Sequence, residues 1–139
     1  MNKRKYSVFL TNVASCSDRY CAAYGPEFTM EEIFDRVKSI PLLDAVDIVM
    51  TQNHITQKDR LRENLSRTGL KVASVAVDTF ANPYYQHGSF ASVDPEVRAA
   101  AIRDAKDAMD FARSLNCNVV TTWPGQDGYD YLFQADYIK

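Results

Sequence analysis

Short apolar runs alternate with amphipathic stretches along the chain. Four runs rich in β-branched and aromatic residues predict strands at about residues 6–10, 45–50, 71–77 and 118–123. Apolar residues at helical spacing predict a helix in each interval between these strands. No two runs are joined by a hairpin turn, and strands that alternate with helices form parallel sheets with right-handed crossovers. The pattern therefore predicts an α/β chain made of parallel βαβ units.

Capping signals mark the ends of the first two predicted helices. Thr29 opens the sequence T-M-E-E, a capping box whose threonine and second glutamate satisfy free N–H groups of the first turn. This helix should run to about Ile40, because Pro41 ends it. Polar residues 51–58 lead into a second helix, and Gly69 stands where a left-handed C-terminal cap is expected.

The third helix follows a long loop, residues 78–93, and loops of this length in a compact domain are usually functional or disordered. Asp94, Pro95 and Glu96 provide a capping carboxylate, a proline at the first helical position and an acid in the first turn. We expect the helix to end near Asn116. Its predicted apolar stripe consists of Val97, Ala101, Ala105, Ala108, Met109, Ala112 and Leu115.

Polar and aromatic residues gather where the predicted strands end. They are Thr11-Asn12, Thr51-Gln52, Asp78-Thr79-Phe80 and Trp123-Pro124-Gly125. TIM barrels place their active sites on this edge, and doubly wound sheets also use it. Both folds satisfy the alternation of strands and helices. The position of these residues favours a barrel, and because a whole barrel needs about 250 residues we expect one partial domain over residues 1–139, the first half of a TIM (β/α)₈ barrel.

Composition excludes several classes of function. The chain is 46% hydrophobic and 24% charged, which is typical of a folded protein and too apolar for a disordered one. Its 16 basic and 18 acidic residues give a net charge of −2, so no basic surplus is present to bind nucleic acid or an anionic membrane. We therefore expect a small or neutral partner.

Cysteines and the first residues indicate the compartment. Cys16, Cys21 and Cys117 are odd in number and fit no common zinc or redox spacing, and no neighbouring base activates Cys16 or Cys21 as a nucleophile. The basic start is followed by an apolar run too short for a signal peptide or a membrane span. We expect reduced thiols in a cytoplasmic protein.

Two stretches carry a resemblance to a known family. Residues 78–98 read D-T-F-A-N-P-Y-Y-Q-H-G-S-F-A-S-V-D-P-E-V-R, and residues 118–131 read N-V-V-T-T-W-P-G-Q-D-G-Y-D-Y. Together with the helix between them they resemble the xylose isomerase family, and S-D-R-Y at residues 17–20 resembles the wider group of sugar isomerases and epimerases. The resemblance implies interconversion of aldoses and ketoses with two divalent metals, usually magnesium, manganese or cobalt.

The resemblance also implies roles for individual residues. Trp123 would form a flat apolar wall against the sugar, and Phe80 would close the pocket from the neighbouring strand. Such walls suit sugars because C–H faces stack on aromatic rings, and they exclude water from the reacting carbons. Asp127 and Gly125 would shape the loop beneath. A core position is the alternative for Trp123.

The chain departs from the family pattern in two places, and there the roles of family residues cannot be assigned to it directly. The family has a histidine and an aspartate that help to open the sugar ring at the end of strand two, where this chain reads M-T-Q-N-H. His54 lies a few residues late and is the candidate for that role. The family's first metal-bridging glutamate ends strand five, and the sequence stops at Lys139 before such a strand. We therefore expect no metal ligand here, no tight metal binding and no isomerase activity of this chain alone.

Several residues have ordinary alternatives. His54 and His87 are the only histidines, and for each a solvated loop position is the default. Asp47 interrupts the apolar run of the second strand. It either points into the barrel towards substrate or pairs with an arginine or lysine on a helix.

Three hypotheses of function stay open. The first is a metal-dependent sugar isomerase that acts on a monosaccharide, with these residues as part of a longer chain. The second is an epimerase or a related metal-dependent barrel enzyme. The third is a non-catalytic half-barrel that binds sugars or pairs with another chain, since open sheet edges and an exposed apolar face favour a homo-oligomer. The sequence does not identify the sugar.

Overall fold

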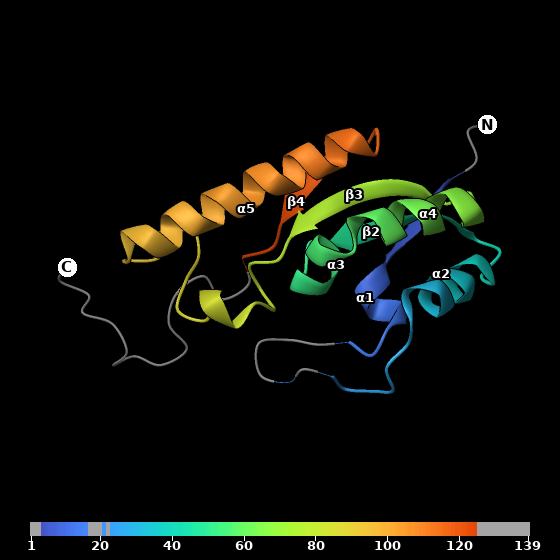
Figure 1. The fold of residues 1–139 in the computed structure, drawn as a ribbon, viewed down its shortest axis with the longest axis horizontal. Helices are drawn as coiled ribbons and strands as arrows, with labels where there is room; N and C mark the ends of the chain where they lie inside the picture. Colours follow the sequence, from blue (N-terminus) through green and yellow to red (C-terminus); the bar gives the residue numbers. More distant parts are fainter. Residues whose placement is uncertain (1–3, 17–20, 22, 125–139) are drawn as a thin grey trace.

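The strands form one parallel sheet in sequential order. The computed structural model describes residues 4–16, 21 and 23–124. Within them the sheet order is β1-β2-β3-β4 (Figure 1). The strands are Tyr6–Phe9 (β1), Leu43–Val49 (β2), Lys71–Val77 (β3) and Val120–Thr122 (β4). A doubly wound sheet reverses its strand order at a switch point, and this sheet does not. The sequential order is that of half a TIM barrel.

The strand bounds differ from the prediction at three of the four strands. β1 stops at Phe9 because Leu10 begins a short helix, α1 (Leu10–Val13). β2 begins two residues early, at Leu43, where the sheet register pairs it with Tyr6 of β1. β4 is shorter than expected and pairs with β3 from Val120 onwards. Only β3 matches its predicted range.

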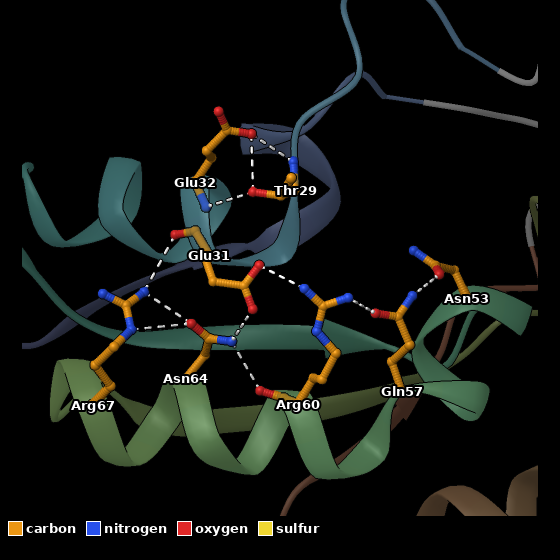
Figure 2. A network of polar contacts seen from close by, with 8 residues as sticks. All are labelled: Thr29, Glu31, Glu32, Asn53, Gln57, Arg60, Asn64 and Arg67. Carbon is orange, nitrogen blue, oxygen red and sulfur yellow. Dashed lines mark hydrogen bonds and ion pairs between the residues drawn. The ribbon is translucent and has the colours of Figure 1, made fainter.

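Three long helices cover one face of the sheet side by side. They are Met30–Lys38 (α2), Lys58–Thr68 (α4) and Pro95–Ser114 (α5). Arg60 of α4 forms an ion pair of 2.7 Å with Glu31 of α2, within the polar network between these helices that Figure 2 shows. On its other side α4 meets α5, because Arg62 donates to Ser114 Oγ at 3.1 Å and lies 5.3 Å from the ring centre of Phe111.

The hydrophobic core lies between this helical layer and the sheet. Alternate strand residues supply it from one side and helical residues from the other. Its fully buried members include Val46, Ile48, Val75, Phe34, Val37 and Leu61. Burial of each such side chain contributes on the order of 1.5–3 kcal/mol. The opposite face of the sheet, which corresponds to the inside of a barrel, carries Asp47 and Ser74.

The capping predictions are confirmed. Thr29 and Glu32 form the capping box of α2, with both reciprocal hydrogen bonds present. Gly69 has φ of +69° at the end of α4, and Asp94 caps α5 ahead of Pro95.

Two helical predictions were wrong. Residues 52–56, expected as part of a polar lead-in, form a separate helix α3 (Gln52–Thr56). Met109 is 54% exposed, although we placed it in the apolar stripe of α5. It follows buried Ala108 directly, and one helical residue turns about 100° away from its predecessor. Phe111 occupies the core instead.

Candidate functional site

The same tight turn ends the two central strands. The N–H of Thr51 donates to the carbonyl of Val49 at 2.8 Å, and the N–H of Thr79 donates to that of Val77 at 3.1 Å. Each turn joins residues i and i+2 and directs the chain away from the sheet. The residues that follow it, at the C-terminal edge, include His54 and Phe80.

Phe80 and Trp123 form a stacked pair at the ends of β3 and β4. Their ring centres are 5.2 Å apart and their planes differ by 7°. Trp123 is 70% exposed, so it is not a core residue. The two rings therefore lie against each other at this edge, and their role as the wall of a sugar pocket stays a prediction.

Thr79 links the two strand ends beneath this pair. It is 1% exposed, and its hydroxyl lies 3.3 Å from Thr122 Oγ1 and 3.4 Å from the carbonyl of Trp123. From the sequence we named Thr79 only as one of the residues at the strand ends and gave it no role of its own. The repeat of V-x-T at the ends of two strands, V-M-T and V-D-T, is the signal that marks it.

His54 is not a solvated loop residue, and that default expectation was wrong. It lies in α3 and is 7% exposed. Its Nδ1 lies 2.6 Å from the carbonyl of Val49, and its main-chain N–H donates to Thr51 Oγ1 at 3.2 Å. Burial lowers the pKa of His54, and the bond to the Val49 carbonyl opposes this shift. His54 is therefore held as a neutral imidazole near neutral pH.

A hollow of about 360 Å³ lies beside His54 at the ends of β1 and β2. Its polar lining includes Thr11, Ser15, Glu27 and Asn53, and Phe28 belongs to its apolar lining. This volume lies within the range of roughly 300–1,000 Å³ typical of small-molecule sites. The hollow offers hydroxyl, amide, carboxylate and imidazole groups next to an aromatic ring.

Asp47 points to the barrel side of the sheet. Its neighbours Val46 and Ile48 belong to the core, and successive strand residues point to opposite faces. Its carboxylate accepts a hydrogen bond of 2.6 Å from Ser74 Oγ. Of the two orientations left open by the sequence, the structure therefore has the one into the barrel.

The acidic residues described do not fit a metal centre. Asp78 accepts a hydrogen bond of 3.0 Å from the N–H of Ala81, and burial raises its pKa. It lines a hollow of about 70 Å³ together with Asp104 and Asp107. Among the residues described, no three histidine, cysteine or acidic side chains are grouped so as to hold an ion.

The remaining predicted residues fall in other places. Asp127 and Gly125 lie outside the described residues. His87 is exposed in a turn after the short 3₁₀ helix Pro83–Tyr85. Cys16, Cys21 and Cys117 form no disulfide with one another. No helix in the described segments is long and apolar enough to span a membrane.

Comparison with known proteins supports the fold. The family described as "Xylose isomerase-like TIM barrel" matches residues 20–137. Xylose isomerase from Thermus thermophilus is 39% identical over 69 residues, which are 50% of this chain and 18% of that protein. Xylose isomerase from Paraburkholderia phytofirmans is 30% identical over 89 residues, 64% of this chain and 20% of that protein. The matched part thus spans about a fifth of these relatives. The chain belongs to the xylose isomerase-like TIM barrel family.

Proposed function

We propose that the chain forms the first half of a sugar isomerase barrel that interconverts aldoses and ketoses, with the remaining strands in the same polypeptide. The stacked pair of Phe80 and Trp123 at the C-terminal edge carries this proposal. The exposed ring of Trp123, stacked on Phe80 at this edge, offers an apolar surface to the C–H face of a monosaccharide. The relatives named xylose isomerase support the same class of reaction.

The residues of this chain would have different roles in binding the sugar and in opening its ring. Trp123 and Phe80 form the wall that binds the sugar and excludes water from it. His54, at the neighbouring strand end, assists ring opening, and Asp127 shapes the loop under the wall. The divalent metal, magnesium, manganese or cobalt, would polarise sugar oxygens and would be held by residues of the second half.

An isomerase assay tests this proposal. The gene is read beyond the codon for Lys139, and both the whole frame and the 139-residue chain are assayed on several aldoses with magnesium, manganese or cobalt. We expect turnover by the whole barrel, and neither turnover nor tight metal binding by the chain alone, because hard divalent ions need several carboxylate ligands. Turnover by the chain alone, or a frame that encodes no further strand, would overturn the proposal.

An epimerase is the second candidate. The hollow beside His54 is lined by hydroxyl, amide, carboxylate and imidazole groups, which can bind sugar hydroxyls in either reaction. Analysis of the products separates the two, because an isomerase converts an aldose into a ketose and an epimerase returns a sugar of the same type with one centre inverted.

A further inference from the structure

The carbonyl of Val49, the last residue of β2, accepts two hydrogen bonds. One comes from the N–H of Thr51 at 2.8 Å and the other from the ring of His54 at 2.6 Å. A carbonyl oxygen can only accept, so His54 Nδ1 must carry the hydrogen. In the neutral ring Nε2 is then the unprotonated nitrogen and a hydrogen-bond acceptor. The geometry thus selects one of the two tautomers.

Thr51 forms hydrogen bonds with both residues of this contact, Val49 and His54. Its N–H fixes the Val49 carbonyl through the tight turn. Its hydroxyl caps α3 by accepting the main-chain N–H of His54 at 3.2 Å, and its own carbonyl accepts the N–H of Ile55 at 2.9 Å. The first turn of α3 is therefore tied to the end of β2, with the imidazole between them.

Among the described residues, the imidazole of His54 forms a hydrogen bond only with the Val49 carbonyl and with none of the charged groups nearby. Glu27 and Cys16 line the same hollow, and Arg60 lines the smaller one of about 150 Å³ beside it. Arg60 is engaged with Glu31 at 2.7 Å and Gln57 at 2.9 Å. Within the described residues no carboxylate bonds to the imidazole. A carboxylate would stabilise the charged ring, whereas a neutral carbonyl does so weakly.

We infer that Thr51 is a positioning residue, which holds the imidazole of His54 on the Val49 carbonyl and leaves Nε2 to accept a hydrogen bond from a substrate hydroxyl. The substrate hydroxyl rests on the proposed function. The tautomer does not rest on it, because the hydrogen bond between His54 and the Val49 carbonyl selects the tautomer without any substrate.

Nitrogen NMR tests the inference on the 139-residue chain labelled with ¹⁵N-histidine. All samples carry His87→Gln, so that His54 gives the only histidine signals. At about pH 8, above the ordinary pKa of histidine, we expect Nδ1 to show the shift of a protonated nitrogen and Nε2 that of an unprotonated one. Thr51→Val removes the capping hydroxyl and should move the two shifts towards each other. Thr51→Ser keeps the hydroxyl and should leave them unchanged.

Thermal unfolding of the same samples separates positioning from simple stabilisation. A lower Tm for Thr51→Val with the tautomer intact would overturn the positioning role. An unprotonated Nδ1 in the parent protein would overturn the inference even if Thr51→Val failed to fold. Isomerase activity of the whole barrel is measured separately. Its absence with the expected tautomer present would refute the proposed function and leave the role of Thr51 standing.

Discussion

Burial makes His54 a pH-sensitive contributor to stability. Its folded-state pKa lies below the ordinary value of 6.5, so the unfolded chain binds more protons once the pH falls below 6.5. The stability that comes from the neutral ring is therefore fully present above this pH and is lost in acid. We expect His54→Gln to lose less free energy of unfolding than the parent protein between about pH 7 and about pH 5.

Urea denaturation at a series of pH values measures this difference. His87→Gln is the matched control, because His87 is exposed. Parallel curves for His54→Gln and the parent protein would show that His54 is not held neutral by burial.

Thr79 is expected to set the position of Trp123 through its buried hydroxyl. Trp123 is the only tryptophan, so the intrinsic emission of the protein reports on its stack with Phe80. Thr79→Val keeps the side-chain shape and removes the hydroxyl that lies 3.4 Å from the Trp123 carbonyl. We expect a changed emission spectrum, stronger quenching by acrylamide, and a loss of about 1 kcal/mol in the free energy of unfolding. Thr79→Ser should resemble the parent, and unaltered emission from Thr79→Val would count against the idea.

The sequence predicted correctly those elements that are determined by residues adjacent in the chain. β3, the capping box at Thr29 and the left-handed Gly69 each depend on residues adjacent in the chain. α3 was missed because residues 52–56 have no apolar stripe of useful length, and the bond of His54 to Val49 anchors the helix to the sheet. The stack of Phe80 on Trp123 joins residues far apart in sequence. Its members were predictable from the family resemblance, but its geometry was not.

The C-terminal cap of α4 gives a prediction at the scale of the element. Gly69 has φ of +69°, and a Cβ built there meets no atom within 4 Å. The cost of a side chain is therefore conformational and not steric crowding by neighbours. We expect Gly69→Ala to lower the free energy of unfolding by about 1 kcal/mol. Gly69→Asn should cost less, because asparagine enters this region more readily. Equal urea midpoints for Gly69→Ala and the parent protein would contradict the assignment.

The sheet has two edges that are open in the described part of the chain. β1 pairs with β2 and β4 pairs with β3, and neither edge strand has a second neighbour there. Val119 and Trp123, at the two ends of β4, are 48% and 70% exposed. Open edges and exposed apolar side chains favour association. We expect the isolated chain to sediment as a dimer or larger assembly. A compact monomer at all concentrations that binds no hydrophobic dye would contradict this expectation.

A crystal structure of the whole barrel soaked with an aldose shows where the sugar binds. We predict the sugar at the C-terminal ends of the strands, with a C–H face against the exposed ring of Trp123 and a hydroxyl within hydrogen-bond distance of His54 Nε2. The same soak of Trp123→Ala should show the sugar weakened or absent. A sugar bound at the opposite edge of the sheet, or bound equally well without Trp123, would show that the C-terminal edge is not the sugar site.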